Sequence, residues 1–192
     1  CEDDPSTDLV LLYLESFGNP HKFARLARRV SEKKPIVAVK SGRSAAGARA
    51  AGAHTGAMLA GSDVTIDALF RQSGVIRTDT VAEMFYVGAL LSNQPVPAGT
   101  RVGIVTNVGG PGILCADACE ARGLDVVNLP PALAEHLLKT LPANASVGNP
   151  VDMTAAASAD HYASTVDALA NAGVVDAVIV IFVPPLVTDP DD

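Results

Sequence analysis

One histidine of the chain stands in a segment built almost wholly from small residues. This segment, KSGRSAAGARAAGAHTGAMLAGSD, runs from residue 40 to 63 and carries His54. About twenty residues separate the apolar run that ends at Gly42 from the helical pattern that begins near Ser62, whereas such connections are usually about 4–6 residues long. A loop of this length is typical of a functional or a disordered segment. His54 is therefore a candidate nucleophile or proton carrier; alternatively, its ring only binds backbone groups.

A reactive histidine needs an acceptor for its second ring nitrogen, commonly a carboxylate, which selects the tautomer and raises the basicity of the reacting nitrogen. Glu15 ends the apolar run LVLLYLE (9–15), which predicts a strand beside the one that ends at Gly42. Because ligands of α/β proteins bind at the carboxyl ends of the strands, we expect Glu15 on the same edge as His54. The alternative is a carboxylate that merely ends a strand.

A second group of small residues follows another predicted strand. In RVGIVTNVGGPGILCADA (101–118) a helix is expected to begin near Pro111 or Gly112, after the glycines Gly109, Gly110 and Gly112. Glycines there let backbone N–H groups point at an anion, and the helix dipole adds about half a positive charge. The pattern is neither G-x-G-x-x-G nor a Walker A loop. It favours a phosphoryl or carboxylate ligand, or else glycines that only allow close packing.

Two smaller groups of residues could add ligands. The turn SVGNPVDM (146–153), which contains Asn149 and Asp152, is expected to border the same pocket as the glycines. Cys115 and Cys119, four residues apart on a predicted helix, could form a metal site with His136. Because free cysteines usually behave as small buried hydrophobic residues, we predict no metal site.

Short apolar runs alternate with segments of helical spacing. The runs, which predict strands covered on both faces, are 9–15, 35–42, 101–107, 124–129 and 174–183. Helical patterns cover 19–33, 62–74, 80–91, 112–123, 131–141 and 160–173. Expected helix signals are Asn19-Pro20 at the first start, Ser62 or Asp63 at the second start and Gly74 at the second end. This alternation predicts an α/β fold with mostly parallel sheets.

The stretch SNQPVPAGT (92–100) carries two prolines and a glycine between a helical pattern and a new strand, which indicates a linker. We therefore predict two α/β units, 1–94 and 95–192. Both ends of the chain adjoin predicted inner strands. The sequence is thus expected to be a fragment of a longer protein, with the first unit truncated at its N-terminus and the second open to truncation at its C-terminus.

Composition limits the classes of function. The chain has 192 residues, of which 48% are hydrophobic and 18% charged, so it can bury a sizeable core. A net charge of -7 and 4% aromatic residues disfavour nucleic-acid binding. No apolar run reaches the roughly 18–20 residues of a membrane span, and the N-terminus is acidic, unlike a signal peptide. Three cysteines without a C-x-x-C spacing fit a reducing cytoplasm.

Together, these motifs resemble the NDP-forming acyl-CoA synthetases, relatives of succinyl-CoA synthetase. The resemblance rests on the histidine segment, GVIRTDTVAEMF (74–85), VTNVGGPGILCADACEARGL (105–124) and ASVGNPVDM (145–153), which follow the family's order. It covers nearly the whole chain. It implies two flavodoxin-like, succinyl-CoA-ligase-like units. The implied activity interconverts acyl-CoA, phosphate and ADP with acid, CoA and ATP through a phosphohistidine on a mobile loop.

The resemblance also implies a role for each candidate residue. His54 stands at the place of the phosphorylated histidine, Glu15 matches the glutamate that holds its ring, and the three glycines match the helix start that receives the phosphoryl group. CoA, ADP or ATP, and Mg²⁺ are implied for the full-length enzyme, and none is assigned to this chain. Implied partners are CoA-binding and ATP-grasp domains or subunits, with acyl-CoA and phosphate as substrates. The family forms multi-domain or multi-subunit assemblies, which leaves a homo-oligomer open.

Two other functions are compatible with the sequence. Similar regions serve as regulatory domains of bacterial protein lysine acetyltransferases, sometimes with the histidine replaced, so a non-catalytic acyl-CoA-sensing domain is the main alternative. The retained His54 favours catalysis. A third hypothesis is an assembly surface with a vestigial site. These motifs specify neither the acyl group nor the choice between ADP and GDP.

Overall fold

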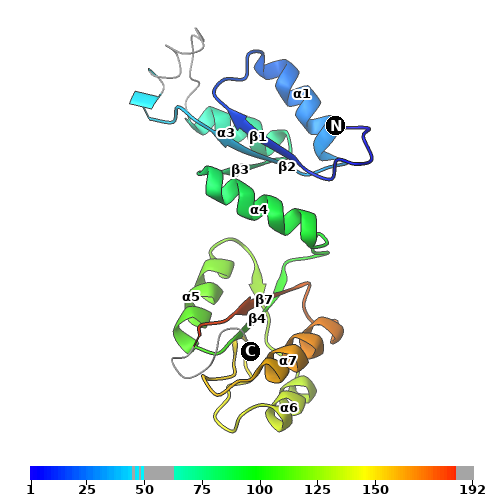
Figure 1. The fold of residues 1–192 in the computed structure, drawn as a ribbon, viewed down its shortest axis with the longest axis vertical. Helices are drawn as coiled ribbons and strands as arrows, with labels where there is room; N and C mark the ends of the chain where they lie inside the picture. The colour runs from blue at the N-terminus through cyan, green and yellow to red at the C-terminus, as the bar shows by residue number, and fades with distance from the viewer. Residues whose placement is uncertain (45, 48, 50–62, 185–192) are drawn as a thin grey trace. The chain divides into compact units, whose positions relative to one another are not determined.

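The computed structural model describes residues 1–44, 46, 47, 49 and 63–184 of the chain. The chain divides into two compact units, Cys1–Val96 and Pro97–Asp192 (Figure 1). Each unit has a sheet whose named strands pair in parallel, with helices between them, which confirms the predicted α/β fold. Among the helices of the described residues, none is long and apolar enough to cross a membrane.

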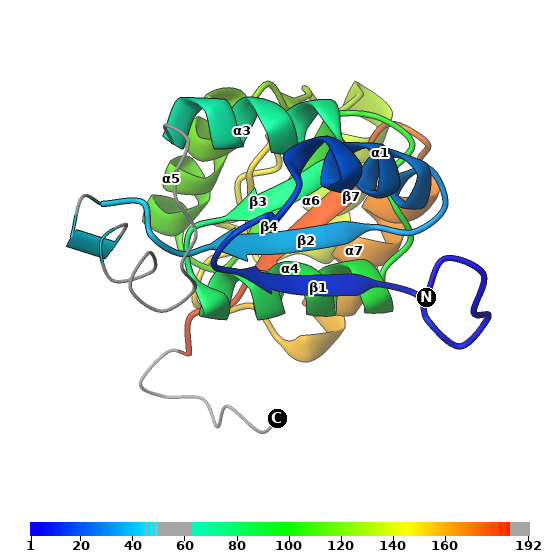
Figure 2. The ribbon, with the colours of Figure 1, turned by 90° about the horizontal axis from the view of Figure 1, so that it is seen from above.

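The first unit is a three-stranded sheet between two helical layers. Its strands, in the order β1-β2-β3, are β1 (Val10–Leu14), β2 (Ile36–Lys40) and β3 (Val75–Thr78). Its helices are α1 (Pro20–Ser31), α3 (Asp63–Gln72) and α4 (Val81–Asn93). Helices α1 and α3 cover one face of the sheet and α4 covers the other (Figures 1 and 2).

Alternation along β2 creates the two core layers of the first unit. Ile36 and Ala38 pack with Phe70 of α3 on one face, whereas Val37 and Val39 pack with Met84 of α4 on the other. All five residues of β2 are buried, as expected for the central strand of a parallel sheet covered on both faces.

The second unit is organised around one central strand, β4. Its strands are β4 (Arg101–Thr106), β5 (Asp125–Val126), β6 (Val151–Asp152) and β7 (Ala177–Ile181). Its helices are α5 (Gly109–Glu120), α6 (Pro131–Thr140) and α7 (Ala159–Asn171). Strand β7 pairs with β4 from Val102 to Thr106, while β5 pairs with the beginning of β4 and β6 with its end. The two short strands therefore share the edge of β4 opposite β7.

Asn149 fills the gap between β5 and β6 on that edge. Its Oδ1 accepts the N–H of Ile104 (2.9 Å), and its Nδ2 donates to the carbonyl oxygens of Val102 (2.7 Å) and Val127 (2.9 Å). One side-chain amide thus satisfies three backbone groups that a continuous neighbouring strand would otherwise pair. This explains why the predicted strand 124–129 is reduced to the two residues of β5.

Three other elements differ from the sequence prediction. No apolar run predicts strand β3, because VIRT is short and its third residue is Arg77. Strand β6 lies within the stretch predicted as a turn, and α5 begins earlier than predicted, at Gly109.

Two predicted helix signals are confirmed. Asn19 accepts the N–H of Lys22 (2.9 Å) at the start of α1, and Gly74 has the left-handed φ of 68° that ends α3.

We expect Asn149→Ala to destabilise the second unit by about 2–4 kcal/mol, because it leaves three backbone groups without their partner. Urea unfolding followed by circular dichroism would measure the loss. Asn144→Ala, in an exposed turn of the same unit, is the matched control and should change stability by less than about 0.5 kcal/mol. Equal stability of the two variants would contradict this role of Asn149.

Candidate active site

The carboxyl ends of β1, β2 and β3 meet at one edge of the first sheet, because the three strands run parallel. Glu15 follows β1 directly and is half-buried. Leu14 pairs with Lys40, the last residue of β2, and the N–H of Ser41 donates to the Leu14 carbonyl oxygen (3.0 Å). Glu15 therefore follows the strand that neighbours the one from which the histidine segment departs. His54 itself lies outside the described residues.

Lys40 is a charged group at this edge that sequence analysis overlooked. Only 6% of the residue is exposed, and its ammonium donates to the carbonyl oxygen of the next residue. Burial, and after it the charge of Arg77, lowers the pKa of Lys40, whereas the carboxylates of Glu15 and Asp63 act in the opposite direction. These four groups share one electrostatic environment. The available signal was a lysine that ends the otherwise apolar run PIVAVK.

Further charges lie around the same edge. They are Arg43 after β2, Asp63 at the start of α3, Arg77 within β3 and Asp79 after β3, and ion pairs join them. No sequence pattern marks Arg43, Arg77 or Asp79 as a candidate, and Asp63 is predicted only as a helix cap. Their common position follows from the pairing of β2 with β3, which the sequence did not reveal.

In the second unit, the predicted glycine turn is the first turn of a helix. Helix α5 begins at Gly109, and its N-cap residue, Val108, makes no side-chain capping bond. Instead, Oγ1 of Thr106 accepts the Val108 N–H (3.1 Å) and donates to the Val108 carbonyl oxygen (2.9 Å). The first N–H groups of a helix have no acceptor within it. This turn therefore offers amide donors and the positive end of a helix dipole to an anion.

The three glycines of this turn differ in their surroundings. A Cβ atom on Gly112 would lie 2.9 Å from Cγ2 of Thr106, and one on Gly109 would lie 2.9 Å from Oδ2 of Asp152. A Cβ atom on Gly110 would meet no atom within 4 Å. Close packing therefore accounts for Gly112, and the approach of a carboxylate accounts for Gly109. Steric fit gives no reason for a glycine at position 110.

Asp152 places a negative charge beside the start of α5, next to Gly109. It ends β6, and its Oδ1 accepts the N–H of Thr154 (3.0 Å). Its charge, after the larger effect of burial, also raises the pKa of Tyr162. A carboxylate is favourable at a helix N-terminus, so an anion bound at this turn has to compete with Asp152.

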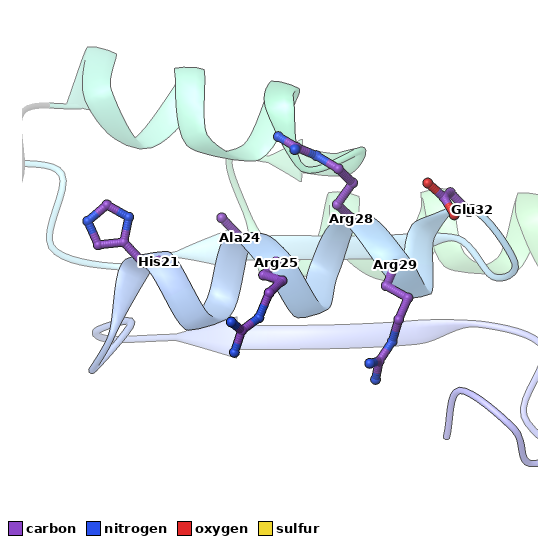
Figure 3. A pocket seen from close by; sticks show the side chains of 6 residues that line it. All are labelled: His21, Ala24, Arg25, Arg28, Arg29 and Glu32. Atoms are coloured by element: carbon purple, nitrogen blue, oxygen red, sulfur yellow. The ribbon is translucent and has the colours of Figure 1, made fainter.

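The cavity on α1 belongs to neither of these places. Its volume is about 380 Å³, and its lining comes from α1 and the residue that follows it: His21, Ala24, Arg25, Arg28, Arg29 and Glu32 (Figure 3). Two of these side chains have partners elsewhere, since Arg28 Nε donates to the carbonyl oxygen of Gln72 (3.1 Å) and Arg29 pairs with Glu2 (2.6 Å). The lining includes neither Glu15 nor Lys40, so the cavity is not part of the predicted site.

The contrast between two glycines of α5 is testable. Gly112→Ala should destabilise the chain by about 1–3 kcal/mol, because the added methyl group overlaps Thr106 in a buried position. Gly110→Ala should be neutral or stabilising by up to about 1 kcal/mol, because the position is open and alanine favours a helix. Urea unfolding measures the free energy of unfolding of both variants. A larger loss in Gly110→Ala than in Gly112→Ala would contradict the tight packing of Gly112 against Thr106.

Two family models match the chain in succession. Residues 1–91 match the succinyl-CoA ligase like flavodoxin domain, and residues 102–191 match the ligase-CoA domain. The chain is 42% identical over 183 residues to the alpha subunit of ADP-forming acetate–CoA ligase II from Pyrococcus furiosus. This match covers 95% of the chain and 40% of that subunit. It is 35% identical over 180 residues to ADP-forming 4-hydroxybutyrate–CoA ligase from Nitrosopumilus maritimus, covering 93% of the chain and 26% of that protein.

A solved structure shares the fold. It is the dinucleotide-forming acetyl-coenzyme A synthetase 1 of Candidatus Korarchaeum cryptofilum in complex with phosphate and ADP. The TM-score is 0.89 at 36% identity, and the match covers 98% of this chain and 41% of that one. The chain therefore spans well under half the length of these relatives.

Proposed function

The chain belongs to the NDP-forming acyl-CoA synthetases, and on this premise we propose that it is part of an acid–CoA ligase that works through a phosphohistidine at position 54. The reaction interconverts acyl-CoA, phosphate and ADP with acid, CoA and ATP. One observation carries the proposal: Glu15 lies at the carboxyl edge of the sheet, directly after the strand next to the one that leads into the histidine segment. Relatives named as ADP-forming CoA ligases support the reaction class.

In the direction of ATP formation, phosphate displaces CoA from acyl-CoA and gives an acyl phosphate. A ring nitrogen of His54 then attacks the phosphorus of this acyl phosphate. The new N–P bond forms as the P–O bond to the acyl group breaks, and the acid leaves as a carboxylate. The ring carries a positive charge until it loses the proton on its other nitrogen. Transfer of the phosphoryl group to ADP then breaks the N–P bond and yields ATP, and the ring takes back a proton, which regenerates the imidazole.

The carboxylate of Glu15 is proposed to accept a hydrogen bond from the ring N–H of His54. A carboxylate there selects the tautomer whose free nitrogen attacks, and it stabilises the cationic ring that the attack creates. The half-buried position of Glu15 strengthens this interaction, because water screens it less than at an exposed site. The nearby ammonium of Lys40 balances the carboxylate while the ring is neutral.

The start of α5 is proposed to receive the phosphoryl group. Backbone N–H groups at Gly109 and Gly110 would donate to phosphoryl oxygens, and the open space around Gly110 gives such a group access. Gly112 serves the same turn indirectly by letting α5 approach β4. The carboxylate of Asp152 would favour release of the phosphoryl group through repulsion, so that transfer stays reversible.

CoA, ADP or ATP, and Mg²⁺ are proposed as ligands of the complete enzyme. Their binding is assigned to CoA-binding and ATP-grasp domains or subunits, which we propose as the partners of this chain. Acyl-CoA and phosphate are the proposed substrates, and the cytoplasm is the proposed location. The names of the relatives include ligases for acetate and for 4-hydroxybutyrate, so family membership does not specify the acid.

Incubating the full-length gene product with ATP and Mg²⁺ should produce a phosphorylated protein whose label is acid-labile and alkali-stable, as expected for phosphohistidine. His54→Ala should abolish the label because it removes the attacking nitrogen. His136→Ala, at an exposed position of α6, is the matched control and should keep it. Labelling of the His54→Ala protein at the wild-type level would contradict the proposal.

Glu15→Gln keeps the shape of the side chain but removes the charge that stabilises the cationic ring. The single-turnover rate of His54 phosphorylation should fall by about tenfold or more, with little change in protein stability. Glu120→Gln, an exposed carboxylate at the end of α5, should leave the rate unaltered. An unchanged rate in Glu15→Gln would remove Glu15 from the mechanism while leaving a phosphohistidine in place.

A further inference from the structure

Four charged side chains connect the two ends of the histidine segment. They are Arg43, Asp63, Arg77 and Asp79, and we call them the charge clamp. Arg43 precedes His54 in the sequence and Asp63 follows it, while Arg77 lies within β3 and Asp79 directly after β3. The clamp thus joins three parts of the first unit: the chain after β2, the start of α3 and the end of β3.

Asp63 is the hub of the charge clamp. Its Oδ1 accepts from Nη2 of Arg77, and its Oδ2 lies 3.3 Å from Nη2 of Arg43. Each carboxylate oxygen therefore faces a different guanidinium. Arg77 also donates from Nη1 to the backbone carbonyl oxygen of Asp63 (3.3 Å), so it holds this residue at two points.

Arg77 is the anchored member of the clamp. Its side chain is 11% exposed, and a second carboxylate, that of Asp67, lies 3.7 Å from its Nη1. A guanidinium in this position needs partners, because an unpaired buried charge is costly. Fixing Asp63 to Arg77 therefore fixes the start of α3 to the sheet.

Arg43 links this anchored pair to the other end of the segment. Its Nη1 donates to Asp79, directly after β3, and its Nη2 reaches Asp63. Just before it, Ser41 is tied to β1 through its backbone N–H and its hydroxyl, both of which donate to the carbonyl oxygen of Leu14 (3.0 and 3.3 Å). The chain is thereby held from the end of β2 to Arg43.

The ionisation states suit such a clamp at neutral pH. The pKa of Asp63 is lowered, first by its bond with Arg77 and further by Arg43, so the hub stays negatively charged. The pKa of Arg43 is raised by its bonds with Asp79 and Asp63. Lys40 and Glu15 add one charge of each sign to the same edge. Exposed ion pairs contribute little to global stability, so stability alone does not account for this network.

We propose that the charge clamp is a positioning device for the phosphohistidine cycle: it holds both ends of the histidine segment at the carboxyl edge of the sheet, where Glu15 lies. The inference rests on the proposed function. Holding Arg43 and Asp63 at this edge would raise the effective concentration of His54 at Glu15. Reacting groups that are misplaced by about 1 Å can lose about a hundredfold in rate. In this proposal Arg43, Asp63, Arg77 and Asp79 act as positioning residues.

The test compares clamp variants of the full-length protein in single-turnover phosphorylation of His54. Asp63→Asn and Arg43→Gln should each lower the rate by about ten- to a hundredfold, with the KM for acyl-CoA nearly unchanged. The Tm should stay nearly unchanged in Arg43→Gln, whose ion pairs are exposed, and should fall in Asp63→Asn, which takes a carboxylate from the nearly buried Arg77. The double variant should lose less than the product of the two single losses, because both changes break the connection between Arg43 and Asp63. Arg43→Lys, which keeps the charge, should recover part of the rate.

Arg29→Gln is the matched control, since the exposed Arg29 of α1 pairs with Glu2 (2.6 Å), a carboxylate outside the clamp. Its rate should equal that of the wild type. Wild-type rates in both Asp63→Asn and Arg43→Gln would overturn the clamp, provided that His54→Ala still abolishes labelling. A label that survives His54→Ala would overturn the proposed function itself. If Asp63→Asn fails to fold, the exposed Arg43→Gln decides the question alone.

Discussion

Parallel pairing of β1, β2 and β3 is the constraint on which the proposed site of the first unit depends. Parallel strands all end at the same edge of a sheet, so residues that are far apart in sequence become neighbours there. Glu15 follows β1, Lys40 ends β2 and Asp79 follows β3. The helix that returns after the histidine segment starts at this edge as well, which brings Asp63 to it.

Charge placed at this edge has to be balanced within the protein. Lys40 and Arg77 project from strands into the face that α1 and α3 cover, where the desolvation of an unpaired cation is costly. The carboxylates of Glu15, Asp63 and Asp67 offset that cost. The same arrangement therefore permits two cations near the core and holds the start of α3 in place. It also keeps the carboxylate of Glu15 at the sheet edge from which the histidine segment departs.

In the second unit, the proposed site at the start of α5 consists of backbone N–H groups rather than charged side chains. The start of α5 approaches β4 closely because Gly112 has no side chain, and Asn149 supplies the hydrogen bonds that β5 and β6 are too short to make. The first feature holds the first turn of α5 close to the carboxyl end of β4, and the second holds the edge of β4 itself. An anion site made of backbone amides requires such rigidity, because the donors cannot adjust independently of the helix.

Local sequence patterns specify the α/β class, the long apolar strands and several helix ends, because apolar periodicity, asparagine caps and left-handed glycines act locally. They also indicate Glu15, His54 and the three glycines as candidates. The folded arrangement, by contrast, shows that α5 already begins at Gly109, that two short strands complete the sheets, and that the three glycines have different surroundings. It alone brought Lys40, Arg43, Asp63 and Arg77 together, because strand order and packing, which no local pattern encodes, determine which distant charges become neighbours.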